Sequence, residues 1–276
     1  MACQLLEGKK GIIFGALDNR SIAWKIAERA YEQGASFTLS NTPVALRFGE
    51  INRLSEKCHS EIIPADATNV SDLEHVFSRT MEIFGGKIDF VLHSIGMSMN
   101  VRKGRNYDDL DYDYFLKTID VSAVSFHKML QVAKKMDAIN DWGSILALTY
   151  IAAQRTLVGY NDMADAKSLL ESIARSFGYI YGREKNVRIN TISQSPTKTT
   201  AGSAIKGMDG LVDFTDRMSP LGNATADECA DFSVVLFSDL SRKVTMQNIY
   251  HDGGFSSMAM SLKAMTQYNK SLDEQV

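Results

Sequence analysis

The sequence predicts an α/β fold in which a seven-stranded parallel sheet carries helices on both faces, in the doubly wound arrangement. Two features of the chain predict it. Short apolar runs of strand length alternate with amphipathic stretches of helical length, which is the pattern that successive strand–helix–strand units produce. Two of these runs, at residues 88–94 and 143–148, are apolar almost throughout, as strands are when a parallel sheet buries both of their faces.

Each predicted strand is a short run rich in β-branched, aromatic or leucine side chains and bounded by glycine, proline or polar residues. In chain order these runs occupy residues 10–14, 36–40, 61–64, 88–94, 143–148, 187–193 and 247–250. Between them, apolar residues recur at helical spacing. The predicted helices occupy residues 21–33, 44–58, 71–84, 111–137, 162–181 and 225–238.

The chain of 276 residues is 45% hydrophobic and shows no repeat or linker, so we expect a single domain over residues 1–276. One stretch interrupts the alternation. Residues 194–223 are rich in Gly, Ser and Thr and exceed the usual length of connections in compact α/β units. Loops of this kind often cover a substrate. We therefore interpret the insertion as a substrate-binding loop, with an ordinary surface excursion as the alternative.

Charge and composition exclude several classes of protein. The 30 Lys and Arg residues against 33 Asp and Glu give a net charge of −3, which does not favour nucleic acid as a partner. No apolar run approaches the ~18–20 residues that span a bilayer, and the first residues lack a signal-peptide layout, so we expect no membrane association. Cys3, Cys58 and Cys229 are isolated and show no CxxC spacing. We expect reduced thiols, no metal site and a cytoplasmic protein.

Small and polar residues follow several predicted strands, at the edge where an open α/β sheet binds its ligand. Gly15 ends the first strand and Ser21 begins the next helix, so the backbone there can approach a phosphate, although the full glycine-rich motif is absent. Asp66 follows the third predicted strand, and the segment from His93 to Gly96 ends the fourth. Each signal alone also fits a turn or a helix cap. Together they indicate a dinucleotide-binding (Rossmann) site.

The end of the second predicted strand bears on the choice between the two nicotinamide dinucleotides. A 2′-phosphate is usually met there by Arg or Lys. This chain has the uncharged run Ser40-Asn41-Thr42-Pro43, and the nearest basic residue, Arg47, lies about one helical turn further on. We therefore expect NADH to be preferred over NADPH by about ten- to a hundredfold, or about 1.4–2.7 kcal/mol.

The candidate catalytic residues follow the fifth predicted strand. Tyr160 and Lys167 are separated by two helical turns and so share one helix face. A cationic Lys near a phenol lowers the pKa of the phenol and can help it stabilise a developing oxyanion. Tyr150 stands at the strand end, where it can line a substrate pocket. For any one of the three, surface packing is the alternative interpretation.

Taken together, these residues resemble the short-chain dehydrogenase/reductase superfamily, and within it the bacterial enoyl-[acyl-carrier-protein] reductases. The resemblance covers nearly the whole chain. The matching motifs are Tyr150-x9-Tyr160-x6-Lys167, Gly15-x5-Ser21-Ile22-Ala23, His93-Ser94-Ile95-Gly96 and Pro196-x2-Thr199.

Ketoreductases of the superfamily differ at two positions that can be read from this sequence. Classical members carry Tyr-x3-Lys, with a catalytic Ser thirteen residues before the Tyr. Here Ala164 occupies the place of that Lys and Ala147 the place of that Ser. The family's usual Ser-Ala-Gly-Pro-Ile before the substrate loop is replaced by the run Ser193-Gln-Ser-Pro196-Thr197.

The resemblance implies a set of site residues. Those implied to bind the cofactor are Gly15, Ser21, Ile22, Thr42, Asp66, Ala67, Ser94, Ile95, Gly96, Lys167, Thr197, Lys198, Thr199, Thr200 and Ala201. Ser98, Tyr150 and Tyr160 are implied to contact the substrate, and Tyr150, Tyr160 and Lys167 to act in catalysis.

The reaction that the resemblance implies is reduction of the carbon–carbon double bond of trans-2-enoyl-[acyl-carrier-protein] thioesters by hydride transfer from NADH, in type II fatty acid biosynthesis. The implied partner is acyl carrier protein, and the implied assembly is a homotetramer. Two alternatives remain open. One is a carbonyl (3-oxoacyl) reductase of the same superfamily. The other is a non-catalytic dinucleotide-sensing module, which would need neither Tyr160 nor Lys167.

Overall fold

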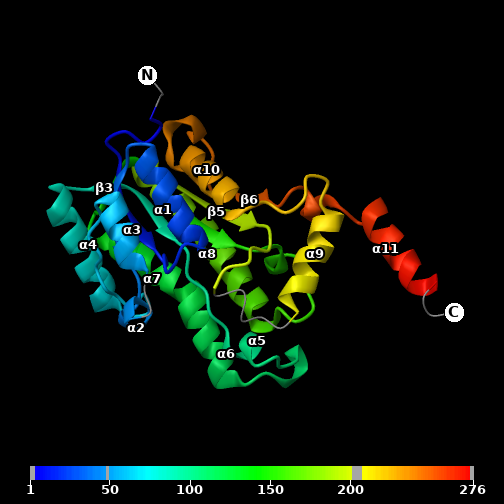
Figure 1. The fold of residues 1–276 in the computed structure, drawn as a ribbon. Coiled ribbons are helices and arrows are strands. Elements are labelled where there is room, and N and C mark those ends of the chain that lie inside the picture. The colour runs from blue at the N-terminus through cyan, green and yellow to red at the C-terminus, as the bar shows by residue number, and fades with distance from the viewer. Residues whose placement is uncertain (1–3, 48–49, 201–206, 274–276) are drawn as a thin grey trace.

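The computed structural model describes residues 4–47, 50–200 and 207–273, and its strands form one parallel sheet. The strand order is β2-β1-β3-β4-β5-β6 (Figure 1). The strands are β1 (Lys10–Phe14), β2 (Ser36–Ser40), β3 (Ile88–His93), β4 (Ile139–Thr149), β5 (Arg188–Gln194) and β6 (Asn248–His251). The chain runs outward from β1 to β2 and then returns to the other side of β1 with β3. The predicted α/β class and the parallel sheet are confirmed.

The prediction of a strand at residues 61–64, the third of the seven expected, is wrong: the described sheet has six strands. This segment makes only an isolated parallel bridge between Leu39 and Ile62 at the outer edge of β2. The Leu39 amide donates to the Glu61 carbonyl (2.9 Å) and the Ile63 amide donates to the Leu39 carbonyl (2.8 Å). Beyond Pro64 the Ala65 amide donates to the Asn41 carbonyl (3.0 Å), so the segment follows β2 through alternate backbone hydrogen bonds and has a neighbour on one side only. The segment is therefore extended along the sheet edge without becoming a strand.

Most predicted helices are present within a few residues of their expected ends. They are α1 (Ile22–Glu32), α4 (Val70–Phe84), α8 (Asn161–Lys185) and α10 (Ala226–Phe237). The predicted helix at 44–58 is divided into α2 (Pro43–Arg47) and α3 (Ile51–Cys58), and that at 111–137 into α6 (Tyr112–Ile119), the π-helical turn η2 (Asp120–Val124) and α7 (Ser125–Lys135). Three helices were not predicted: α5 (Met99–Arg102), α9 (Met208–Met218) and α11 (Leu262–Asp273).

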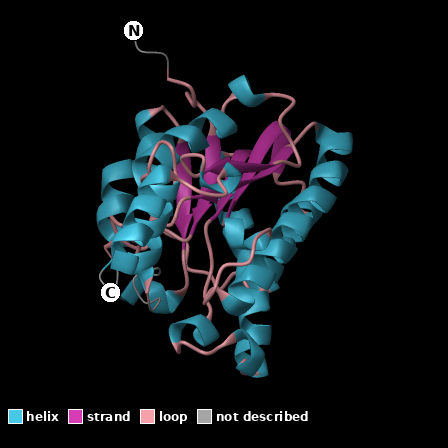
Figure 2. Ribbon diagram, turned by 90° about the vertical axis from the view of Figure 1, so that its right-hand side faces the viewer, coloured by secondary structure: helices cyan, strands magenta, loops and turns pink. Residues whose placement is uncertain are grey.

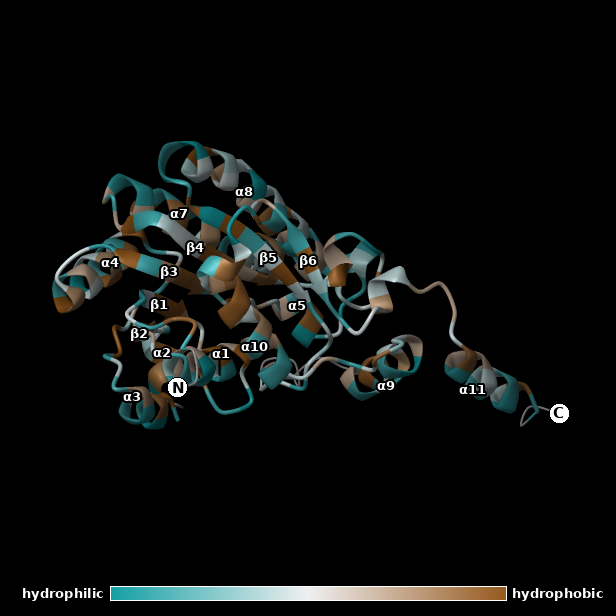
Figure 3. Ribbon diagram, turned by 90° about the horizontal axis from the view of Figure 1, so that it is seen from above, coloured by the Kyte–Doolittle hydropathy of each residue, from teal (hydrophilic) through white to brown (hydrophobic). Residues whose placement is uncertain are grey.

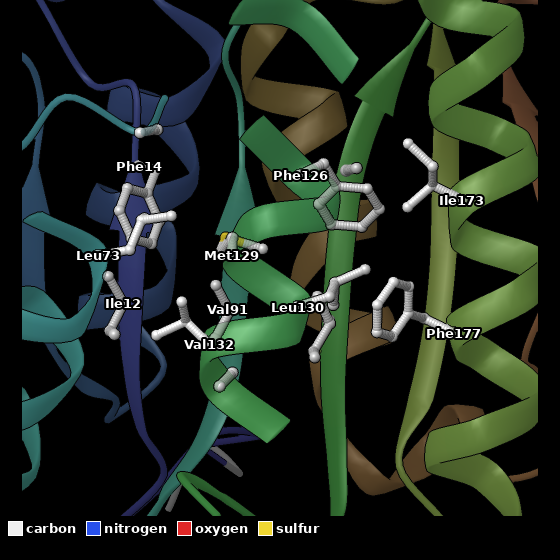
Figure 4. Close-up of a cluster of buried hydrophobic side chains, with 14 of the residues drawn as sticks. Ile12, Phe14, Leu73, Val91, Phe126, Met129, Leu130, Val132, Ile173 and Phe177 are labelled. Atoms are coloured by element: carbon white, nitrogen blue, oxygen red, sulfur yellow. The ribbon is translucent and has the colours of Figure 1, made fainter. Parts of the chain in front are cut away.

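The core lies on both faces of the sheet, as the doubly wound arrangement requires. Successive residues of a strand face opposite sides. Ile12 and Phe14 of β1 therefore belong to a buried cluster that extends over α4, α7 and α8 (Figure 4), whereas Ile13 belongs to a cluster with residues of α1, α3 and α10 on the other side. Figure 2 shows the strands between these two helical layers, and Figure 3 shows apolar residues concentrated on the strands and on the helix faces toward them.

The last helix is placed differently from the others. In Figures 1 and 3, α11 stands away from the body formed by the sheet and its two helical layers, beyond α9. Among the described residues no helix is both long enough and apolar enough to cross a membrane. Cys58 and Cys229 are free and buried, and Cys3 lies outside the described residues.

Candidate active site

Two adjoining cavities open at the carboxyl edge of the sheet, where the strand order reverses beside β1. This is the place at which open α/β sheets bind ligands. The first cavity measures about 310 Å³ and the second about 200 Å³. Residues that line the first include Gly15, Ser21, Ile22, Asn41, Ala45, Ser94, Ile95, Gly96, Lys167, Thr199 and Thr200. Residues that line the second include Ile22, Gly96, Ser98, Val101, Arg102, Tyr150, Tyr160, Met163, Lys167, Pro196, Thr197, Thr199, Met208 and Leu211.

Gly15 allows the backbone after β1 to lie against the backbone after β3. Its φ of +97° belongs to the left-handed region, and a Cβ at this position would lie 2.0 Å from the Ser94 carbonyl oxygen. The two segments are joined by a bond from the Ser94 amide to the Phe14 carbonyl (3.2 Å). A glycine is therefore required here on two counts, and its missing side chain keeps the floor of the first cavity open.

The loop between Gly15 and α1 is held by Ser21. The Ser21 hydroxyl donates to the Asp18 carbonyl (2.7 Å) and accepts from the Leu17 amide (3.2 Å). It makes no cap bond to the helix amides, and no acidic residue occupies the first turn of α1. The positive end of that helix therefore remains available to a phosphate in the first cavity.

The end of β2 closes the first cavity with uncharged groups. The Asn41 side-chain amide donates to the Ala16 carbonyl (2.8 Å), which ties the ends of β1 and β2 together. Thr42 accepts a bond from the Ala45 amide (3.3 Å) at the start of α2 and does not line either cavity. Arg47 is exposed at the end of α2 and also lies outside both linings.

Lys167 lies where the two cavities meet and lines both. It projects from α8 toward the strand ends, where its Nζ donates to the carbonyls of Leu148 (2.9 Å) and Ile95 (3.4 Å). Burial lowers the pKa of Lys167 to about 8, against the opposing influence of the Glu171 carboxylate. The amine is thus cationic at neutral pH but close to its titration point.

Tyr150 and Tyr160 pack against each other on the second cavity, with ring centroids 5.0 Å apart. Burial raises the pKa of both phenols above the ordinary tyrosine value. The predicted lowering of the Tyr160 pKa by Lys167 is therefore wrong. Lys167 donates to backbone carbonyls, and no hydrogen bond joins it to Tyr160 among the described residues. Both phenols are protonated at neutral pH and can act as hydrogen-bond donors.

Ser98 belongs to a buried network beneath the second cavity. Its hydroxyl donates to Asp162 Oδ1 (2.6 Å) and accepts from the Val101 amide at the start of α5 (3.0 Å). The other carboxylate oxygen of Asp162 accepts from Asn100 (2.8 Å) and Thr118 (2.9 Å). Ser98 lines the cavity, but its hydroxyl is already engaged in holding the cavity wall.

The remaining predicted site residues divide into two groups. Thr197, Thr199 and Thr200 line the cavities, together with Pro196. Asp66, Ala67 and Lys198 line neither: Asp66 accepts two bonds from Thr68, Ala67 is buried in the core, and Lys198 pairs with Asp209 at 2.7 Å. Ala201 lies outside the described residues.

Several lining residues were not identified from the sequence. Asn41 could have been found, because it immediately follows the second predicted strand. Met208 and Leu211 lie on α9, inside the segment 194–223 that the sequence indicated only as a loop. Arg102 reaches the second cavity from the short helix α5, in a stretch where the sequence carries no motif.

Comparison with known proteins agrees with this geometry. A family model described as "Enoyl-(Acyl carrier protein) reductase" matches residues 15–256. The chain is 35% identical over 262 residues, covering 94% of each protein, to the enoyl-[acyl-carrier-protein] reductase [NADH] 1 of Rhizobium meliloti. It is 33% identical to the corresponding enzyme of Rickettsia typhi, covering 95% of this chain and 99% of that protein.

Solved structures show the same similarity. The crystal structure of a FabI–NADH complex from Alistipes finegoldii superposes with a TM-score of 0.94 at 70% identity, covering 96% of this chain and 94% of that one. The enoyl-acyl carrier protein reductase of Bacillus cereus, solved with NADP+ and indole naphthyridinone, gives a TM-score of 0.86 at 30% identity, covering 93% of this chain and 99% of that one. The predicted resemblance is confirmed, and the chain belongs to the enoyl-(acyl carrier protein) reductase family.

Proposed function

We propose that this protein reduces the carbon–carbon double bond of trans-2-enoyl-[acyl-carrier-protein] thioesters with NADH, in type II fatty acid biosynthesis. The observation that carries the proposal is the position of Lys167. It lines both cavities, whereas Tyr150 and Tyr160 line only the second. A cofactor in the first cavity and an acyl thioester in the second would therefore meet at Lys167. The family match and the NADH-dependent relatives support the same reaction.

The first cavity suits a nicotinamide dinucleotide. The left-handed Gly15 leaves no side chain between the ends of β1 and β3, and the unblocked N-terminus of α1 favours phosphate. Gly15, Ser21 and Ile22 would hold the pyrophosphate, and Ser94, Ile95 and Gly96 would lie along the nucleoside. Lys167 would bind the hydroxyls of the nicotinamide ribose, near Thr199 and Thr200. When bound, the dinucleotide supplies a hydride.

NADH is the cofactor we propose, because the end of β2 provides no cation for a 2′-phosphate. Asn41 and Ala45 line the cavity there, while Arg47 is exposed outside it. The measurement is kcat/KM with each cofactor at a fixed enoyl substrate. An advantage for NADH of about ten- to a hundredfold is expected. Equal values, or a preference for NADPH, would show that a basic residue reaches this end of the site.

Tyr160 would stabilise the charge that develops during the reaction. Addition of hydride to the β-carbon of the thioester places negative charge on the thioester oxygen. Because burial raises the pKa of Tyr160, its hydroxyl stays protonated and can donate a hydrogen bond to that oxygen. The α-carbon then receives a proton, by way of Tyr160 or from solvent by way of Lys167. Tyr150 packs on Tyr160 and fixes the orientation of its ring.

The segment after β5 would keep water from the developing charge. Pro196 and Thr197 line the second cavity, and Met208 and Leu211 of α9 add apolar side chains to the same wall. Exclusion of water strengthens the hydrogen bond from Tyr160 to the oxyanion. This arrangement supports the interpretation of 194–223 as a substrate-binding segment.

One experiment separates the proposed reaction from its alternatives. The purified protein is mixed with NADH and a crotonyl thioester, and separately with NADH and an acetoacetyl thioester, and the absorbance of NADH is followed. Oxidation with the crotonyl thioester alone is expected. Oxidation with the acetoacetyl thioester alone would indicate a carbonyl reductase. No oxidation with either, together with tight NADH binding, would indicate a dinucleotide sensor.

We further propose that the protein is a single domain and acts as a cytoplasmic homotetramer on substrates carried by acyl carrier protein. The single sheet supports the domain prediction. Leu169 and Tyr179 are exposed on α8 and would be covered if this helix lies at a subunit contact. Light scattering coupled to size-exclusion chromatography tests for the tetramer. A monomeric mass at micromolar concentration would contradict this proposal.

A further inference from the structure

Glu171 is a buried carboxylate to which the mechanism above assigns no role. It lies in α8 one turn after Lys167, and only 3% of its surface is exposed. Its Oε1 accepts from the Thr149 hydroxyl (2.8 Å) and its Oε2 from the Gln154 side-chain amide (2.9 Å). Both donors are neutral. A buried carboxylate is costly unless hydrogen bonds and a cation compensate it, and Lys167 is the cation with which it interacts.

The two oxygens of Glu171 hold the two ends of the segment that carries Tyr150. Thr149 immediately precedes Tyr150 at the end of β4, and Gln154 ends the short turn η3 (Ile151–Ala153) that follows it. The Tyr150 hydroxyl is buried and has no hydrogen-bond partner among the described residues. Its position therefore depends on its packing against Tyr160 and on the segment whose Thr149 and Gln154 side chains Glu171 binds.

Glu171 and Lys167 also join α8 to the end of β4 as a pair. Lys167 donates to the carbonyl of Leu148, and the next residue, Thr149, donates to Glu171. The two hydrogen bonds start one helical turn apart on α8 and end at neighbouring residues of β4. Displacement of Glu171 would thus release the strand end against which Lys167 is held.

Among the described residues, Glu171 is the charged group that acts on Lys167. Lys167 also faces His93 of β3, whose pKa burial lowers to about 3, and the phenols Tyr150 and Tyr160, which burial keeps protonated. These groups are neutral at neutral pH. Asp252, after β6, acts on Tyr150, and Tyr250 of β6 lies near Glu171, where its hydroxyl donates to Gln154.

We propose that Glu171 is a positioning residue of the reductase, which fixes the Tyr150 segment through its two hydrogen bonds and places its negative charge one helical turn from Lys167. This inference rests on the proposed function, because it assigns Glu171 to the same site. It implies two separable effects. Loss of the charge alone changes the titration of Lys167, and loss of the hydrogen bonds alone changes turnover.

Glu171→Gln removes the charge and keeps the shape. The amide oxygen can accept from Gln154, and the amide nitrogen can donate to the Thr149 hydroxyl. The Cβ atoms of residues one helical turn apart are separated by about 5–6 Å, and we take this as the distance between the two charges. Effective dielectric constants of about 80 to 20 then predict that the Lys167 pKa falls by about 0.5 to 2 units in Glu171→Gln. The pKa is measured by NMR with 13C-labelled lysine, with Lys167→Met identifying the signal. The high-pH limb of the NADH-dependent kcat/KM should move to lower pH by the same amount.

Glu184→Gln is the matched control. It makes the same substitution at the far end of α8, where Glu184 is exposed and pairs with Lys134. It should change neither the titration of Lys167 nor the pH profile. Thr149→Val removes one hydrogen bond and leaves the charge, so it should lower kcat and leave the high-pH limb in place.

The outcomes distinguish this inference from the proposed function. If wild-type protein does not oxidise NADH with an enoyl thioester, the proposed function fails, while the NMR titration still tests the coupling of Glu171 to Lys167. If wild-type protein is active, an unchanged Lys167 pKa in Glu171→Gln overturns the role of the charge, and an unchanged kcat in Thr149→Val overturns the positioning role. Should Glu171→Gln not fold, Glu171→Asp replaces it, because Asp keeps the charge with a shorter reach. A normal Lys167 pKa with kcat lowered at least tenfold is then expected, and an unchanged kcat would overturn the positioning role.

Discussion

Replacement of Gly15 by alanine should damage both folding and cofactor binding, and the structure allows the cost to be estimated. A left-handed φ costs alanine about 1–2 kcal/mol. The new Cβ would also lie 2.0 Å from the Ser94 carbonyl oxygen, far inside contact distance, so the ends of β1 and β3 must separate. That movement strains the bonds from Ser94 to Phe14 and from Gly15 to Ser40, each of which contributes about 1 kcal/mol. The expected total is about 3–4 kcal/mol.

Gly85→Ala is the control for this experiment. Gly85 also has a left-handed φ, of +67°, but a Cβ there would meet nothing within 4 Å. It should cost only the conformational part, about 1–2 kcal/mol, and leave NADH binding intact. Urea unfolding and NADH titration are measured for both variants. Gly15→Ala should be less stable than Gly85→Ala by about 2 kcal/mol and should bind NADH at least about a hundredfold more weakly. Equal stabilities and equal affinities would refute the account of the strand ends.

Three further substitutions test other parts of the site. Lys167→Met should weaken NADH binding at least about tenfold. Because burial holds the Lys167 pKa at about 8, below its unfolded value, the protonated amine opposes folding below pH 8, and this opposition fades as the pH rises. The unfolding free energy of wild-type protein should therefore rise by about 1 kcal/mol relative to Lys167→Met between pH 7 and pH 9, and a constant difference would contradict the buried cation. Tyr160→Phe should lower kcat by roughly 10²–10³-fold with little change in KM; a change in KM alone would limit Tyr160 to substrate binding. Asp162→Asn should lower the free energy of unfolding, measured with urea, by about 2–3 kcal/mol, because the new side-chain NH₂ would face hydroxyl and amide donors. An unchanged free energy of unfolding would argue against the network beneath Ser98.

Most of the sheet could be predicted from the sequence, because the residue patterns that indicate strands and helices are local. The apolar runs of β1, β3 and β4 and the helical periodicity of α1, α4 and α8 are each contained in one stretch of chain. Residues 61–64 have the same apolar character, but a strand also needs partners along its length. The position at the outer edge of β2, with a neighbour on one side only, decided that outcome, and it is not visible in residue type.

Part of the site could also be predicted, because the sequence indicates where strands end. Residues at strand ends, such as Gly15 and Ser94, follow from the topology, because the carboxyl ends of parallel strands meet at one edge. Asp66 could not be placed in this way, because a cavity lining depends on the direction of a side chain. The electrostatics of Tyr160 depend on depth: the sequence shows the Lys seven residues away, but not the burial that raises the phenol pKa. Glu171 carries no motif, and its role emerges only when α8 is packed on β4.

The most direct test of the central claim is the destination of the hydride. The protein is incubated with NADH carrying deuterium at the transferred position and with a trans-2-enoyl thioester, and the product is examined by mass spectrometry and NMR. The account predicts a saturated acyl thioester with deuterium on the β-carbon in wild-type protein and greatly slowed formation of it in Lys167→Met. An enoyl thioester left unreacted, or a saturated product without deuterium on the β-carbon, would contradict the account.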